Sequence, residues 1–328
     1  MARTPEEISH FISKTAFAGA QLQPLAGDAS SRRYVRAVLG EKSAMIMDSP
    51  AEGENFQAFV TIAEYLYSNG YSAPEILARN MAAGLLLLED FGDESFSRVV
   101  SKNPSQETKL YEAAIDLLAQ WQSLPSIALP CYNLELYMRE VTLFCDWFLP
   151  KILGAEKSAS LRTEYLAIWQ GILANAPLAQ NIFVHRDFHA DNLMWLPSRA
   201  GAKRLGLLDF QDGVIGDAAY DMVSLLEDAR RDVPSELAQE MIARYLAKTG
   251  ADAARFNTAY SVLGAQRNSK IIGIFVRLAV RDGKQNYLQY LPRVWGYLER
   301  DLEHQNLAPL REWLDKNIPA RLRHEVGQ

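Results

Sequence analysis

The hydrophobic pattern near the N-terminus predicts one helix followed by short strands. Thr4 and Glu7 have the spacing of a capping box around Pro5, so we expect a helix over 5–17. Short apolar runs then alternate with turns that contain glycine or serine. These runs predict strands at 21–25, 34–38 and 44–47.

The next segments complete an N-terminal lobe. Large apolar residues recur at helical spacing over 54–68, and Asn69-Gly70 supplies a stop signal. The run Leu85–Leu88 has the composition of a fully buried strand, and the polar segment 90–93 breaks it. We therefore place the lobe boundary here, with an N-lobe over 1–89 and a C-lobe over 90–328.

The remainder of the chain has mostly helical periodicity. Apolar stripes predict helices at 107–124, 133–149, 160–174, 220–228 and 236–248, with several more between 256 and 315. Two short apolar runs, 193–196 and 205–210, interrupt them as a small β insert. The expected class is α+β, with an antiparallel sheet and one main helix in the N-lobe and a larger, mainly helical C-lobe.

Composition restricts the function classes. The 328 residues are 48% hydrophobic and 23% charged with a net charge of −6, which is typical of a soluble globular chain without a broad nucleic-acid-binding surface. No apolar run reaches the roughly eighteen residues of a membrane span. Cys131 and Cys145 lie in apolar sequence without a Cys-x-x-Cys pair, so we expect buried thiols and a cytoplasmic protein. The oligomeric state cannot be deduced from these patterns.

The segment 183–216 concentrates the chemistry, and it has two interpretations. His185, Asp187, His189 and Asp191 alternate, so on a strand all four side chains would share one face and form a metal cluster, as in a metallohydrolase. Two coordination spheres would need further histidines, and only His304 and His324 follow, towards a charged C-terminus. This count favours the other interpretation.

The second interpretation is phosphoryl transfer. Asp187 would accept a proton from a substrate hydroxyl, while the oxygens of Asn192 and Asp209 would hold Mg²⁺ against nucleotide phosphates. A hairpin built from 193–196 and 205–210 would bring Asn192 close to Asp209. The loop 27–31 consists of small residues that let backbone N–H groups approach phosphates, although a simple hairpin turn explains it equally well.

The motifs HRDFHADN (185–192) and LLDFQDG (207–213), in this order beyond a β-rich lobe, resemble the aminoglycoside phosphotransferase and choline kinase-like superfamily, which has the protein-kinase fold. Further segments, among them GDASSRRY, MDSP, GLLLLEDFGD and AYDMVSLLEDARRDV, are similar to bacterial cell-wall-recycling kinases. Those enzymes phosphorylate N-acetylmuramate and N-acetylglucosamine at the anomeric hydroxyl. The resemblance covers nearly the whole chain.

The resemblance implies a role for each motif residue. It makes Asp187 the catalytic base, with Asn192 and Asp209 as Mg²⁺ ligands and His185 as a brace of the catalytic loop. ATP is the implied donor. Its phosphates would bind the loop with Gly27, Asp28, Ser30 and Ser31, and its adenine would bind the hinge Glu89 to Phe91.

One feature of the family pattern is missing. Kinases of this fold carry a lysine on the third strand that binds phosphates, and here Met45 and Met47 occupy the candidate positions. We hypothesise that Arg32, Arg33 or Arg36 supplies the positive charge, the alternative being that all three are surface arginines.

The acceptor side has several candidates. An arginine could bind the lactyl carboxylate of N-acetylmuramate through its planar fork. The residues considered for the acceptor are His189, Asp191, Asp228, Arg230 and Arg231, with Gln266, Arg267 and Lys270 as a second polar set. Charges at a helix end are commonly solvated or paired with one another, which is the structural alternative. A kinase for an aminoglycoside or other small alcohol, and a non-catalytic nucleotide-binding protein, remain competing functions.

Overall fold

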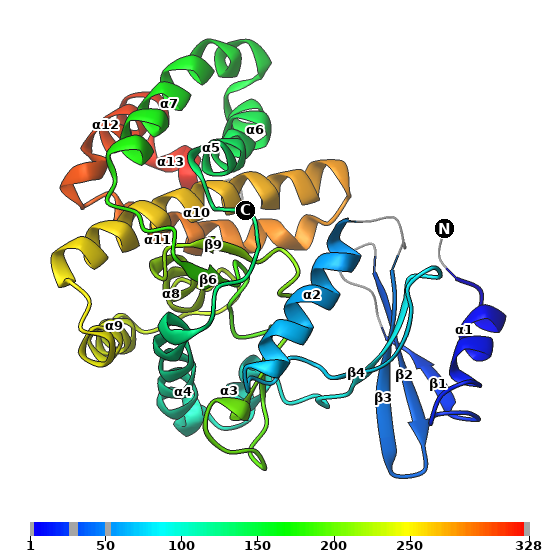
Figure 1. Ribbon diagram of the computed structural model, residues 1–328. Helices are drawn as coiled ribbons and strands as arrows, with labels where there is room; N and C mark the ends of the chain where they lie inside the picture. The colour runs from blue at the N-terminus through cyan, green and yellow to red at the C-terminus, as the bar shows by residue number, and fades with distance from the viewer. Residues whose placement is uncertain (1–2, 26–31, 50–53, 325–328) are drawn as a thin grey trace. The chain divides into compact units, whose positions relative to one another are not determined.

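The computed structural model describes residues 3–25, 32–49 and 54–324, which divide into two compact units. The first unit contains the N-terminal residues up to 114 together with 190–213, and the second contains 115–189 and 214–328. Figure 1 labels most of the helices and strands of both units. The expected functional boundary between residues 89 and 90 stays a prediction.

The first unit is built on a five-stranded antiparallel sheet with the strand order β1-β2-β3-β5-β4. The β2–β3 turn contains Gly40, whose φ of 61° suits glycine. The three predicted N-terminal strands and the buried strand at 85–88 are confirmed. The strands are β1 (Gln21–Pro24), β2 (Arg33–Leu39), β3 (Lys42–Asp48), β4 (Ile76–Asn80) and β5 (Leu85–Glu89).

Two helices lie on opposite sides of this sheet (Figure 1): α1 (Pro5–Ile12) and α2 (Glu54–Ser68). The predicted capping box at Thr4 is present, and Ile8, Phe11 and Ile12 of α1 pack into a core with the sheet. The expected helix over 5–17 ends at Ile12 instead. Ser13 and Thr15 explain this early end, because their hydroxyls donate to the carbonyls of His10 and Ile12, at 2.9 and 2.8 Å.

The predicted β insert contributes a hairpin to the first unit. β7 (Leu193–Trp195) and β8 (Leu205–Leu207) pair antiparallel, with Leu193 opposite Leu207. Gly206 of β8 lies so close to the Phe91 ring that an added Cβ would be 2.6 Å from a ring carbon. The unit also contains α3 (Phe96–Lys102) and the first half of α4 (Glu107–Gln120).

The second unit packs around one long helix, α10 (Ala253–Arg281), which contacts α5 (Leu134–Leu143), α8 (Ala219–Leu226) and α11 (Leu291–Asp301). An added Cβ on Gly273 would be 2.4 Å from the backbone carbonyl of Leu143, so α10 and α5 approach closely. The second unit also contains α7 (Ala155–Asn175), α9 (Ser235–Thr249), α12 (Ala308–Asn317), α13 (Ala320–His324), β6 (Ile182–Val184) and β9 (Val214–Gly216).

A π-helical turn, Phe144–Phe148, joins α5 to α6 (Leu149–Leu153). Phe144 stacks on Phe148 and Tyr165, with ring centroids 4.8 and 5.2 Å away. The turn buries Cys145 as expected, whereas Cys131 is exposed, so the prediction of two buried thiols is wrong for Cys131. No helix in the described part of the chain is both long and apolar enough to cross a membrane.

Candidate active site

The segment after β6 is a loop whose backbone is fixed by a buried carboxylate. β6 ends at Val184, and the N–H groups of His185 and Arg186 then donate to the two oxygens of Asp221, at 2.7 and 2.9 Å. Arg186 has a φ of 74°, which is uncommon for a residue with a side chain. The alternation that predicted ligands on one strand face is therefore not realised, because 185–191 is not a strand.

His185 supports this loop from within. Its ring is buried, and its Nδ1 accepts a hydrogen bond of 3.3 Å from the backbone N–H of Asp187. The ring also meets Phe188 edge to face, with centroids 5.7 Å apart, and Phe188 packs against Trp121. The contacts match those of a brace, and the bracing role remains a prediction.

Asp187 is surrounded by basic side chains. Burial raises the pKa of its carboxyl, but the positive charges of Lys270 and Arg267 act in the opposite direction and leave the pKa below its ordinary value. Asp187 is therefore a carboxylate near neutral pH, able to accept a proton but only weakly basic.

A buried ion network lies next to the loop in the same unit. Glu140 accepts hydrogen bonds from Arg186, Lys270, Tyr132 and Gln266, with 2.8 Å to the Lys270 ammonium. Burial raises the pKa of Glu140, yet Lys270 and Arg186 outweigh this effect and hold it at about 2. The carboxylate thus pairs with both cations, balances one of their two positive charges and fixes the side chain of Arg186.

The structure brings together three of the predicted acceptor residues. The Nε2 atom of the buried His189 lies 3.2 Å from Nη1 of Arg230, and the backbone N–H of Arg230 donates to Asp228 at 2.8 Å. A guanidinium has no acceptor, so Nε2 is the acceptor and the ring proton is on Nδ1. Burial lowers the pKa of His189, and Arg230 adds to this effect while Asp228 opposes it. His189 is therefore neutral and orients Arg230.

The β7–β8 hairpin brings the predicted metal ligands, Asn192 and Asp209, to the same end of the hairpin. The N–H of Leu208 donates to the carbonyl of Asn192 at 3.0 Å, and Asp209 follows directly with a φ of 61° and a side chain that is 47% exposed. One amide oxygen and one accessible carboxylate fit Mg²⁺, which is usually held by one or two carboxylates, waters and substrate phosphates. The donor set therefore suits the implied metal.

The described residues form no metal cluster of histidines and carboxylates. Across residues 3–25, 32–49 and 54–324, no group of three or more His, Cys, Asp or Glu side chains is placed to hold a metal ion. The interpretation of 185–191 as a metallohydrolase site is therefore wrong for the described residues.

The other predicted positions have varied surroundings. Gly27, Asp28, Ser30 and Ser31 lie outside the described residues. In the hinge, Arg199 pairs with Glu89 and lies 5.2 Å from the centre of the Phe91 ring. Asp191 is exposed, and the backbone carbonyl of Arg231 accepts a hydrogen bond of 3.3 Å from Tyr297.

Comparison with known proteins identifies the family. The model of the phosphotransferase enzyme family matches residues 21–256, which is more than half of the chain. This chain is a member of the phosphotransferase enzyme family. It is 37% identical to the N-acetylmuramate/N-acetylglucosamine kinase of Caulobacter vibrioides over 95% of this phosphotransferase and 96% of the relative.

Solved structures confirm the expected kinase-like fold of the phosphotransferase. The choline kinase of Streptococcus pneumoniae aligns with a TM-score of 0.63 at 14% identity, over 92% of this chain and 98% of that one. The phosphotransferase APH(2″)-IIa, in its ternary complex with streptomycin and ATP, aligns with a TM-score of 0.59 at 16% identity, over 88% and 97% of the two chains. The predicted superfamily and fold class are thus confirmed.

Sequence reasoning missed three residues of this phosphotransferase. Asp221 and Glu140 are buried carboxylates that hold the loop around Asp187, and Gln211 bonds to the carboxylate of Asp209 at 3.0 Å. An acidic residue within an apolar helix, such as Asp221 in AAYDMVSLL, is a signal that could have been found, because buried carboxylates need partners. Glu140 lies among other polar residues of its helix and gives no such signal.

Proposed function

We propose that this chain is an ATP- and Mg²⁺-dependent kinase that phosphorylates the anomeric hydroxyl of an amino sugar of the N-acetylmuramate and N-acetylglucosamine class. The name of its Caulobacter vibrioides relative supports the acceptor, and the ATP complex of a structural neighbour supports the donor. The proposal includes a cytoplasmic role in cell-wall recycling. The observation that carries it is Asp187, a carboxylate held by a braced loop and kept ionised by basic neighbours.

In the proposed reaction, the anomeric oxygen forms a bond to the γ-phosphorus while the bond from that phosphorus to the bridging oxygen of ADP breaks. Asp187 receives the hydroxyl proton. An anomeric hydroxyl is more acidic than an ordinary alcohol, so a carboxylate with a lowered pKa suffices as the base. Asn192 and Asp209 would hold Mg²⁺, which would supply positive charge against the phosphates.

The charge around Asp187 favours this acceptor over a polycation. Arg267 and Lys270 of α10 both lower the pKa of Asp187, which means that they place positive charge close to its carboxylate. An aminoglycoside carries several ammonium groups and would be repelled there. A purely non-catalytic nucleotide-binding protein would have no use for the braced Asp187.

The test is turnover of the purified protein with ATP and Mg²⁺ on N-acetylmuramate, N-acetylglucosamine and an aminoglycoside, scored by ADP release and by loss of the reducing end. We expect both amino sugars to lose their reducing end. In Asp187→Asn, kcat should fall by about 10²–10⁴-fold with unchanged ATP binding. The control is Asp146→Asn, a surface ion-pair residue of the same unit. Turnover of the aminoglycoside alone, or normal turnover in Asp187→Asn, would refute the proposal.

Arg230 is the residue that we propose for the lactyl carboxylate of N-acetylmuramate, because His189 contacts its guanidinium and Asp228 holds its backbone N–H. N-acetylglucosamine lacks this carboxylate. Arg230→Ala should therefore raise KM for N-acetylmuramate about tenfold or more and leave N-acetylglucosamine nearly unchanged. Arg231→Ala is the matched neighbour, and an equal effect on both sugars would contradict the assignment.

A further inference from the structure

The third strand of the sheet supplies no cation for nucleotide phosphates in its interior. Lys42 is the first residue of β3 and is exposed, while Met45 and Met47 lie opposite Arg36 and Tyr34 of β2. A kinase needs a positive charge beside the phosphates in addition to the metal. The three arginines that the sequence offers for this charge are Arg32, directly before β2, and Arg33 and Arg36 within β2, and their surroundings differ.

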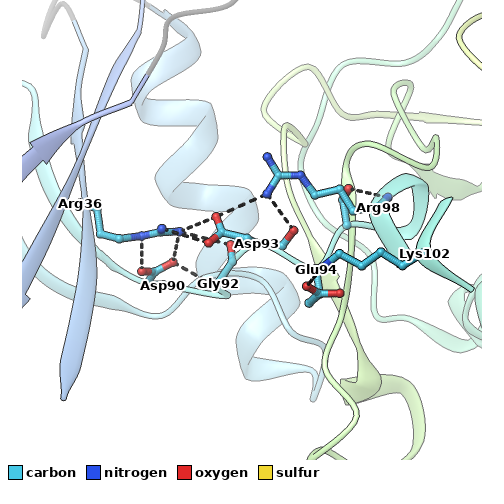
Figure 2. A network of polar contacts seen from close by, with 8 residues as sticks. Arg36, Asp90, Gly92, Asp93, Glu94, Arg98 and Lys102 are labelled. Carbon is cyan, nitrogen blue, oxygen red and sulfur yellow. Dashed lines mark hydrogen bonds and ion pairs between the residues drawn. The ribbon is translucent and has the colours of Figure 1, made fainter. Parts of the chain in front are cut away.

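Arg36 is committed to the chain that follows β5. Figure 2 shows its guanidinium between Asp90 and Asp93, with 2.7 Å from Nε to Asp90 and 3.0 Å from Nη2 to Asp93. It also donates to the carbonyl of Gly92 at 3.3 Å. Two carboxylates already neutralise this arginine, and the hydrogen bond to Asp93 raises its pKa above the ordinary value. Its structural role is to fix the exit from the sheet.

Arg33 is committed to the N-terminal segment. Its Nε donates to Asp48 at 3.1 Å and its Nη2 donates to the carbonyl of Arg3 at 2.7 Å. The Asp48 side chain is buried and needs this cation, whereas the Arg33 side chain is 47% exposed. Arg33 thus joins β2, β3 and the start of the chain.

Arg32 lies against the predicted metal ligand. Its side chain is only 6% exposed, and Nη1 is 2.6 Å from Oε1 of Gln211 and 3.5 Å from Oδ1 of Asp209. Gln211 in turn donates to the same Asp209 oxygen at 3.0 Å. Burial raises the pKa of the Tyr34 hydroxyl above its ordinary value, while the charge of Arg32 and a hydrogen bond with it act in the opposite direction. Arg32 is thus a buried guanidinium positioned by two neutral side chains beside a carboxylate.

We propose that Arg32 binds the phosphate chain of the nucleotide and takes the role of the absent third-strand lysine. The inference rests on the proposed use of a nucleotide triphosphate. Magnesium held by Asp209 would bring phosphate oxygens to that carboxylate, within reach of the neighbouring guanidinium. Arginine keeps its charge at all working pH values, and its planar fork suits phosphate oxygens. The distance of 3.5 Å to Asp209 is longer than an optimal charge-assisted bond of about 2.8 Å.

The experiment measures binding without turnover, by titrating Mg·ATP, Mg·ADP and adenosine into protein without acceptor in a calorimeter. Arg32→Ala should weaken Mg·ATP and Mg·ADP about 10- to 100-fold and leave adenosine unchanged, because adenosine has no phosphate. Arg32→Lys keeps the charge, so its affinity for Mg·ATP and Mg·ADP should lie between those of the wild type and Arg32→Ala. Arg79→Ala, an exposed ion-pair arginine of the same unit, is the control and should bind like the wild type.

Equal weakening of all three ligands, or no change in any, would overturn the assignment, and so would a larger loss in Arg33→Ala than in Arg32→Ala. If Arg32→Ala does not fold, Arg32→Lys and Arg32→Gln decide, since only the lysine should retain part of the phosphate-dependent affinity. The two proposals fail separately. If the wild type does not phosphorylate amino sugars, the proposed function is refuted. Phosphate-dependent nucleotide binding through Arg32 could still be observed in that case.

Discussion

Replacing Glu140 with glutamine should destabilise the second unit by an amount that depends on pH. Glu140→Gln keeps the shape of the side chain but removes the negative charge that pairs with Arg186 and Lys270, whose side chains are only 16% and 15% exposed. The pKa of Glu140 falls from its ordinary value of 4.5 to about 2 in the folded protein. A difference of this size corresponds to about 3 kcal/mol of stability at neutral pH. This agrees with the general cost of removing one partner of a buried ion pair, which is about 3–5 kcal/mol.

The sign follows from the lowered pKa. The contribution of Glu140 is fully present above its ordinary pKa of 4.5 and is lost as the pH falls towards about 2. Between pH 7 and pH 4, about 1 kcal/mol of it should disappear. Urea unfolding of wild type and Glu140→Gln at both pH values measures this directly, provided that the m-values agree.

The control is Glu64→Gln, because Glu64 and Arg79 form an ion pair with side chains 51% and 46% exposed. Its loss should cost less than about 1 kcal/mol. If Glu140→Gln costs no more than this control, or costs the same at pH 7 and pH 4, the charge of Glu140 does not stabilise the fold.

Two further predictions concern backbone geometry. Gly273→Ala should destabilise the protein by about 1–3 kcal/mol, because its Cβ would meet the Leu143 carbonyl at 2.4 Å. Gly171 lies in a helix where an added Cβ would meet no atom within 4 Å, so Gly171→Ala should instead stabilise the protein by up to about 1 kcal/mol. Thermal unfolding measures both variants, and a shift of the melting temperature in the same direction for both would contradict this contrast. Asp221→Ala removes the acceptor for the N–H groups of His185 and Arg186, so kcat should fall about 100-fold with nucleotide affinity unchanged. Wild-type kcat in a folded variant would show that Asp221 does not position Asp187.

Local features could be predicted where the residues that determine an element lie next to it in the sequence. The helix over 54–68 agrees with α2 because Asn69-Gly70 ends it. The proximity of Asn192 and Asp209 was predictable since a short hairpin leaves few registers. The end of α1 was mispredicted because side-chain hydroxyls of Ser13 and Thr15 compete with the helix.

The partners of Asp187 were harder to predict because they come from distant segments. Glu140 binds Arg186 across 46 residues of sequence, and Lys270 reaches Glu140 across 130. No periodicity links such positions, so their pairing depends on how the helices of the second unit pack. The choice among Arg32, Arg33 and Arg36 had the same difficulty, since all three look equivalent until their carboxylate neighbours are known.

The π-helical turn at Phe144–Phe148 affects where the helical segment formed by α5 and α6 can gain or lose a residue. A π turn holds one residue more than the α-helical turn that it replaces, so it absorbs a single inserted residue without shifting the helix on either side. Deleting one residue here would restore regular α-helical geometry. A deletion elsewhere in α5 would instead rotate everything beyond it by about 100° and turn buried faces towards water. The second unit therefore has a place where chain length can change by one residue while α5 and α6 keep their buried faces.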